Sequence, residues 1–190
     1  MPKPPYHLSA VRLSADEYVA VNLRLWRARP ATRRNYALLG VAVLLLSLSI
    51  GLDLWQNSRP ERTSTFIFLG VAVLYGLSRA ALMRWQLRRG YTRNAGLQQP
   101  LDFRLTNSEI IGRSPQGQFS SKWPQLKRAV WVGTDWLLLY PTETACYYLD
   151  LRQLQPPATP ADVARLLAQH AVPQQRVGGG GNLPGSDGVA

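Results

Sequence analysis

The sequence has very few of the side chains that carry redox, metal and nucleophilic chemistry. Among 190 residues there are one cysteine, Cys146, and two histidines, His7 and His170. A single cysteine excludes a disulfide within the chain and a cysteine metal cluster, and Cys146 is typical of a small core residue. Both histidines lie outside the expected strands, which leaves no serine–histidine–aspartate candidate. We therefore expect no enzymatic activity, no cofactor and no bound metal.

Acidic side chains are also scarce, with 11 Asp and Glu against 22 Lys and Arg and a net charge of +11. In a soluble protein such an excess would indicate a nucleic-acid partner. Its distribution argues against that partner, because residues 1–35 carry a charge of +5 and residues 76–100 another +5, whereas residues 101–172 carry only +1. The excess flanks two apolar stretches, and we expect no nucleic acid to bind.

These two apolar stretches organise the rest of the chain. Residues 36–54 and 65–83 would each form a helix of about 28 Å, close to the ~30 Å hydrocarbon core of a bilayer. Neither stretch has the charged stripe of an amphipathic helix, although two buried helices of a soluble domain are the alternative. The pattern predicts two transmembrane helices joined by an external loop at 55–64.

The basic residues lie on one side of the predicted hairpin. Because cytoplasmic loops carry the excess of Lys and Arg, both termini are expected in the cytoplasm. The first thirty residues lack the apolar core and cleavage site of a signal peptide, so we expect none to be removed. The membrane-flanking basic residues, expected beside lipid headgroups, are Arg27, Arg29, Arg33, Arg34, Arg84, Arg88 and Arg89.

Small residues recur at four-residue spacing within both predicted spans. Such faces allow helix backbones to approach closely, so the spans are expected to pack on each other, on a partner protein or on a second copy. The residues concerned are Ser47, Gly51, Ala72, Gly76 and Ala80. Arg79, the one charge within 65–83, lies near the inner end, where its side chain can reach the interface, and two spans enclose no transport pathway.

The N-terminal segment, residues 1–35, contains an amphipathic helix. Ser14 and Glu17 fit a capping box, and the helix should end near Arg29, before Pro30. Two placements stay open. The helix packs on the cytoplasmic domain or on the membrane-proximal ends of the spans, or it lies in the membrane interface with its arginines on anionic headgroups.

After a basic linker at 84–100, the pattern changes to short alternating strands separated by turns. The strands are expected at 101–105, 110–112, 118–122, 127–132, 136–140 and 145–149. Thr159 and Pro160 then begin an amphipathic helix. Residues 101–172 are therefore predicted as a cytoplasmic α+β, mostly β, domain. It would be a small antiparallel barrel or sandwich capped by a C-terminal helix, followed by a disordered glycine-rich tail at 173–190.

One cluster of basic and aromatic residues is a candidate interaction surface. It consists of Lys122, Trp123, Lys127 and Arg128. Such a surface would suit headgroups or an acidic peptide. The alternative is that Trp123, Trp131 and Trp136 pack in the core and need no binding role.

Several short motifs carry a resemblance to a known family. They are Leu13, Ser14, Glu17 and Tyr18 at the helix entry, the strand and turn at 105–110, Ser120 followed by Trp123 and Leu126, and the apolar strand at 136–140. With the two closely spaced spans, the layout from Tyr6 to His170 resembles the YcxB-like family of bacterial membrane proteins. The resemblance implies a pleckstrin-homology-like cytoplasmic domain and no particular biochemical role. The chain departs from the family at 148–152, where similar sequences carry an isoleucine–proline–lysine-like segment.

From these patterns and the resemblance we expect a non-catalytic interaction or regulatory module tethered to the inner membrane of a bacterium. The alternatives are a module that responds to anionic lipids and an accessory subunit of a membrane transporter. The expected partners are membrane lipids and either another protein or a second copy of the chain.

Overall fold

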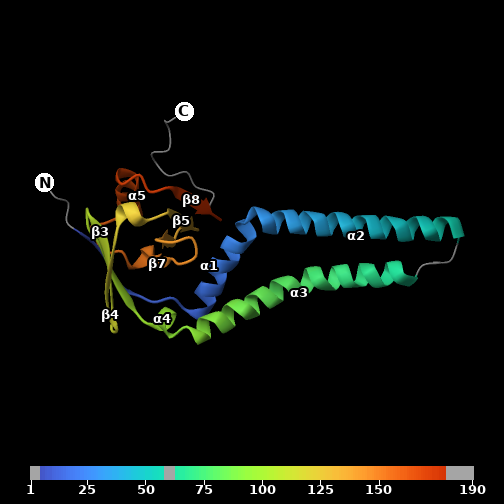
Figure 1. Ribbon diagram of the computed structural model, residues 1–190, viewed down its shortest axis with the longest axis horizontal. Coiled ribbons are helices and arrows are strands. Elements are labelled where there is room, and N and C mark those ends of the chain that lie inside the picture. The colour runs from blue at the N-terminus through green and yellow to red at the C-terminus, as the bar shows by residue number, and fades with distance from the viewer. Residues whose placement is uncertain (1–4, 58–62, 179–190) are drawn as a thin grey trace, which may run out of the picture.

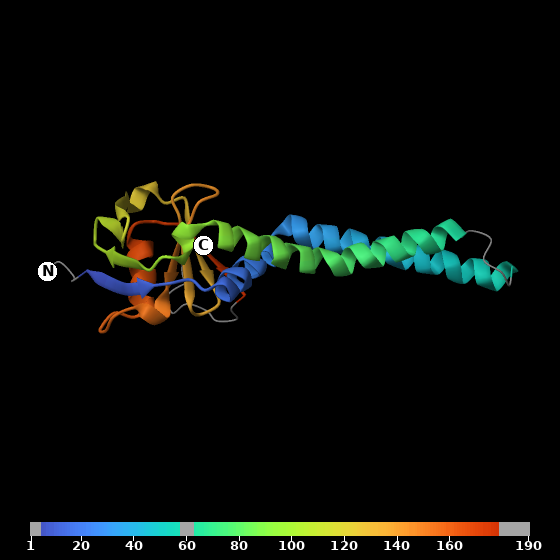
Figure 2. The same ribbon diagram turned by 90° about the horizontal axis from the view of Figure 1, so that it is seen from below.

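The computed structural model describes residues 5–57 and 63–178 of the chain. A long pair of helices projects from one end of a β domain, and a shorter helix, α1, lies between the two parts (Figure 1). A view turned by 90° shows the same arrangement (Figure 2). Residues 58–62 of the predicted loop and residues 179–190 of the predicted tail lie outside the described residues.

Helix α1, Ala15–Ala28, begins at the predicted capping box. The Ser14 hydroxyl accepts a hydrogen bond from the Glu17 backbone N–H (3.2 Å), and the Glu17 carboxylate accepts one from the Ser14 N–H (3.0 Å). Arg29 is extended, with ψ at 131°, and α2 starts at Pro30. Both predicted ends of α1 are confirmed, because proline suits a first helical position but not a helix interior.

The long helices α2, Pro30–Asn57, and α3, Thr63–Arg93, extend beyond the predicted spans. The linker predicted at 84–100 is largely helical, since α3 continues to Arg93 and a short helix, α4, covers Ala95–Gln98. Leu87 and the buried Tyr91 prolong the inward face of α3 past the apolar stretch, so the helix has no reason to end at residue 83.

Most side chains of both long helices are exposed. Each is long and apolar enough to cross a membrane, and only 6% and 0% of their most apolar windows are buried. A soluble core helix would be mostly buried. The interpretation as buried helices of a soluble domain is therefore not supported.

The β domain consists of two four-stranded sheets, in the orders β1-β2-β3-β4 and β7-β6-β5-β8. The strands of the first sheet are β1 Tyr6–Val11, β2 Leu101–Leu105, β3 Glu109–Ser114 and β4 Gly117–Lys122. The second sheet has β5 Arg128–Val132, β6 Trp136–Tyr140, β7 Tyr147–Asp150 and β8 Gln174–Val177. All neighbouring strands are antiparallel except β5 and β8, which are parallel. Two 3-10 turns, η1 Trp123–Gln125 and η2 Leu151–Gln153, and helix α5, Pro160–Gln169, complete the domain.

Six of these strands and α5 match the predicted elements, whereas β1 and β8 were not predicted. The sequence pattern left β1 without a strand assignment and placed β8 in the disordered tail. The tail prediction is wrong for residues 174–177, because β8 is held by backbone pairing to β5.

The main core lies between the two sheets and α5. Its fully buried members include Phe103, Ile110, Leu137, Leu139 and Leu167. A second cluster lies between the β5–β6–β7–β8 sheet and α1 and includes Leu13, Val21, Val130, Val132 and Leu138. Strand β6 is therefore covered on both faces, which explains its unbroken run of apolar residues. Trp123, Trp131 and Trp136 are all buried, so their interpretation as packing residues is confirmed.

Candidate functional site

A cleft of about 640 Å³ lies between α1 and α3, next to the apolar part of the hairpin. We call it the arginine cleft. Its lining residues are Asp16, Val19, Ala20, Leu23, Arg24 and Arg27 on α1 and Arg84, Trp85 and Arg88 on α3. The α1 members recur three and four residues apart and so share one face of the helix. Four arginines against one aspartate give the lining a net charge of +3, and the remaining lining residues are apolar.

One end of α1 is fixed to the C-terminal part of α3. The buried Tyr91 hydroxyl donates a hydrogen bond to the Leu13 carbonyl (2.6 Å), and the Tyr18 and Tyr91 ring centroids are 5.7 Å apart. Arg88 forms an ion pair with Asp16. That pair is exposed and contributes little, so the buried Tyr91 hydrogen bond and the ring contact are the stronger constraints.

The other end of α1 is held by Arg79. The Arg79 guanidinium carbon lies 5.6 Å from the Trp26 ring, 5.3 Å from the Tyr36 ring and 5.8 Å from the Tyr75 ring. These aromatic rings stabilise the positive charge of Arg79, which lies within a largely apolar helix. Because Tyr91 meets the start of α1 and Arg79 meets its end, the two helices run antiparallel and present their arginines to the same cleft.

The structure divides the predicted membrane-flanking arginines into three groups. Arg27, Arg84 and Arg88 line the arginine cleft, and Arg89 stacks on Trp85 with 5.1 Å between guanidinium carbon and ring centroid. The exposed residues Arg29, Arg33 and Arg34 lie at the junction of α1 and α2. Arg24, which is not among the predicted membrane-flanking residues, also lines the cleft.

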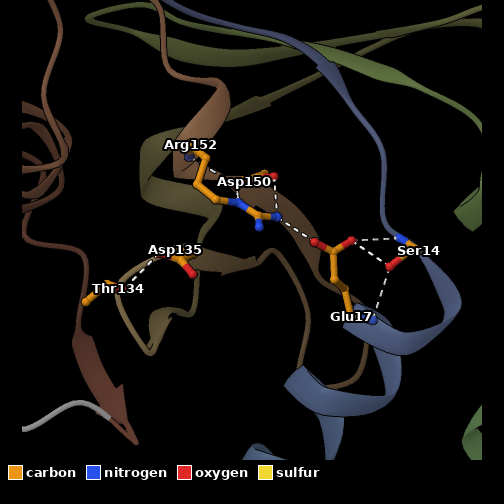
Figure 3. A network of polar contacts seen from close by, with 6 residues as sticks. All are labelled: Ser14, Glu17, Thr134, Asp135, Asp150 and Arg152. Carbon is orange, nitrogen blue, oxygen red and sulfur yellow. Dashed lines mark hydrogen bonds and ion pairs between the residues drawn. The ribbon is translucent and has the colours of Figure 1, made fainter.

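The opposite face of α1 packs on the β domain, and a polar network secures its first turn (Figure 3). Arg152 donates two hydrogen bonds of 2.8 Å to Asp150 and a further one to Glu17. Burial raises the pKa of Glu17, but hydrogen bonds from Arg152 and Ser14 outweigh it and lower that pKa below its ordinary value. Of the two placements considered for this helix, packing on the domain and on the spans is the one observed.

A second cleft, of about 720 Å³, lies between the C-terminal end of α1 and the β5–β6–β7–β8 sheet. Arg128 stacks on Tyr140 there at 4.6 Å, and its buried Nε has no hydrogen-bond partner among the described residues. Burial raises the pKa of the Cys146 thiol, although hydrogen bonds with Tyr148 and Tyr140 oppose the shift. A raised pKa disfavours the thiolate, which is the reactive form of a cysteine.

The predicted interaction surface is not formed as expected. Trp123 is fully buried, stacks on His170 at 5.4 Å and donates a hydrogen bond to the Thr106 carbonyl (3.0 Å). Lys122 and Lys127 are exposed, but Arg128 lines the second cleft. The assignment of Trp123 to a surface is wrong, because a tryptophan beside lysines is equally compatible with a core side chain whose neighbours reach solvent.

The small residues of the two spans face different ways. Ala72, Gly76 and Ala80 are half-buried, and a Cβ built at Gly76 would lie 3.1 Å from Leu39 Cδ2 on α2. Ser47 and Gly51 are exposed, and a Cβ at Gly51 would meet no described atom within 4 Å. The small residues of α3 therefore lie in the contact between the two helices, whereas Ser47 and Gly51 of α2 lie outside it.

Within residues 5–57 and 63–178, no group of three or more His, Cys, Asp or Glu side chains could hold a metal ion. Comparison of the chain with protein-family models, curated proteins and solved structures finds no match. The resemblance to the YcxB-like family stays a prediction.

Proposed function

We propose that the chain is a non-catalytic interaction or regulatory module anchored in the bacterial cytoplasmic membrane by the α2–α3 hairpin. The observation that carries this proposal is the nearly bare apolar surface of α2 and α3, which ends where α1 and the arginine cleft begin. Soluble monomers rarely expose apolar patches larger than a few hundred Å². A bilayer would bury this surface, and every backbone group of the two helices would stay hydrogen-bonded.

The charge distribution gives the proposed orientation. Arginines gather at the end of the hairpin that adjoins the β domain, whereas Asp53 is the charged residue near the described far end of α2. The positive-inside rule then places the β domain and both termini in the cytoplasm.

The fold supports a finer proposal. Two mostly antiparallel four-stranded sheets, followed by helix α5, are compatible with a pleckstrin-homology-like domain in a YcxB-like protein. Strand β8, which follows α5 and runs parallel to β5, is an addition to the expected layout.

A second candidate function is that of an accessory subunit of a membrane transporter. It is favoured by the outward stripe of Ser47 and Gly51, which does not contribute to the contact with α3. Co-purification with a larger membrane protein that is lost in Gly51→Leu but retained in Gly70→Leu would support this function. Gly70 is an equally uncrowded glycine and lies on α3, outside this stripe. Purification of the chain alone from mild detergent would contradict it.

Membrane anchoring is tested by alkaline carbonate extraction of bacterial membranes that contain the full-length chain. We expect the protein to remain in the membrane pellet and to be released by detergent. A Leu44→Arg, Leu74→Arg double variant, which places two charges in the apolar stretches at a cost of about 3 kcal/mol each, should lose much of this resistance. Recovery of the unaltered protein in the soluble fraction would contradict the proposal.

A further inference from the structure

We infer that the arginine cleft binds the phosphate of an anionic phospholipid headgroup. This inference rests on the proposed membrane anchoring and names the ligand that the anchored protein would take at this site. Three features support it: the charge of the cleft, the geometry of its hydrogen-bond donors and its position along the hairpin.

The charge of the cleft is only partly compensated. Asp16 pairs with Arg88, whereas Arg27 and Arg84 form no ion pair with a described residue. Arg24 also lines the cleft and forms no such pair, but its guanidinium lies beside Gly133 in the β5–β6 turn. Guanidinium groups offer forked donors that match phosphate oxygens two at a time. Arginines from two facing helices can therefore hold one phosphate from both sides.

The cleft lies at the level where a headgroup would be. Trp85, which lines it, is 55% exposed, and Leu82, nearly one turn earlier on α3, is 53% exposed. Tryptophan is enriched at the boundary between apolar chains and water. If the phosphate of a phospholipid lay among the arginines, the acyl chains of that lipid would lie beside Leu82 and the apolar surface of α3.

The lining of the cleft suits a lipid better than a soluble phosphate ester. Val19, Ala20, Leu23 and Trp85 are part of the lining, and these apolar groups would contact the glycerol and the upper part of an acyl chain. A soluble ester would leave that apolar surface uncovered. Lys122 and Lys127, which were first expected to contact headgroups, do not line this cleft.

The test uses the full-length protein in a neutral detergent, titrated with phosphatidylglycerol or phosphatidylcholine and read by native mass spectrometry. The cleft variant is Arg24→Gln, Arg27→Gln, Arg84→Gln. The matched control is Arg33→Gln, Arg34→Gln, Arg93→Gln, which removes the same charge from α2 and α3 outside the cleft. We expect the wild-type chain to prefer phosphatidylglycerol, the cleft variant to lose affinity on the order of tenfold, and the control to change by about twofold or less.

Equal losses in the two variants, or no preference in the wild-type chain, would overturn the inference. If glycerol 3-phosphate displaces the lipid at equal concentration, the ligand is a soluble phosphate ester and the lipid assignment is wrong. Should the triple variant lose its helical circular-dichroism spectrum, the single variants Arg27→Gln and Arg84→Gln carry the same comparison. Failure of the carbonate test would instead contradict the anchoring, so the two failures are distinguishable.

Discussion

Arg152 connects parts of the molecule that are far apart in the sequence. Its guanidinium binds the buried Asp150 with two hydrogen bonds, binds Glu17 at the start of α1 and lies 5.5 Å from the Trp136 ring centroid. Its donors are directed to carboxylates of this chain, so it serves to fix α1 on the β domain.

Glu17→Gln tests this connection through its pH dependence. Glutamine still suits the capping box, so the substitution removes mainly the charge that faces Arg152. Because the folded-state pKa of Glu17 is lowered, ionised Glu17 adds stability that is present above its unfolded pKa, near 4.5, and lost as the pH falls through the folded value. We expect the variant to lose about 0.5–1 kcal/mol of unfolding free energy at pH 7.

Chemical unfolding of both proteins at pH 7 and at about pH 3, which is below the ordinary range of a glutamate pKa, measures the difference. The deficit of the variant should shrink at the lower pH as wild-type Glu17 becomes protonated. An equal deficit at both pH values would contradict an electrostatic role for Glu17.

Tyr91→Phe tests the attachment of α1 to α3. The substitution removes the hydroxyl that donates to the Leu13 carbonyl and leaves a buried acceptor unpaired, which costs about 1–3 kcal/mol. Thermal unfolding in detergent should show a lower midpoint. Tyr75→Phe is the control, since the Tyr75 side chain is largely exposed and the ring that faces Arg79 is kept. Equal midpoints for Tyr91→Phe and wild type would contradict the proposed attachment.

At the scale of elements, α1 has two occupied faces. One face packs on the β5–β6–β7–β8 sheet, and the other lines the arginine cleft against α3. A ligand bound by arginines of both α1 and α3 would contact α1, which is also the helix that packs on the β domain. The helix is thus the physical link between the proposed headgroup site and the domain.

The contact between α2 and α3 has a matched pair of glycines. Gly76→Leu would drive a side chain into Leu39 and cost about 1–3 kcal/mol, whereas Gly51→Leu enters open space. Thermal unfolding in detergent should show a lower midpoint for Gly76→Leu alone. Equal effects of the two substitutions would contradict the helix contact described here.

Elements with local signals were predicted well. The capping box of α1, the turns between β2 and β6, and Thr159 with Pro160 at α5 all act within a few residues. Strands β1 and β8 depend on partners far away in the chain. The pairing of β1 with β2 shifts between Leu8 and Val11, where Ala10 adopts φ of 52° and its N–H is bound by Asp102. The polar β8 shows no apolar alternation, so its sequence carried no strand signal.

At the scale of the whole molecule, charge and apolar surface are separated along the long axis. The flanking charge singled out Arg27, Arg84 and Arg88, which the structure brings together in the arginine cleft. The cleft they form was not predictable, because the antiparallel placement of α1 on α3 depends on Tyr91 and Arg79 contacts between distant segments. The predicted surface around Trp123 failed for a related reason, since burial is a property of the whole fold.

The central claim is that α2 and α3 cross the membrane with the β domain in the cytoplasm. Cysteine accessibility tests it in a Cys146→Ser background with single cysteines at two exposed positions, Ser64 at the start of α3 and Gln116 in the β3–β4 turn. In intact spheroplasts, an impermeant maleimide should label Ser64→Cys at once and Gln116→Cys only after permeabilisation. Labelling of Gln116→Cys without Ser64→Cys would invert the orientation, and equal labelling of both in a soluble fraction would show that the helices do not span a membrane.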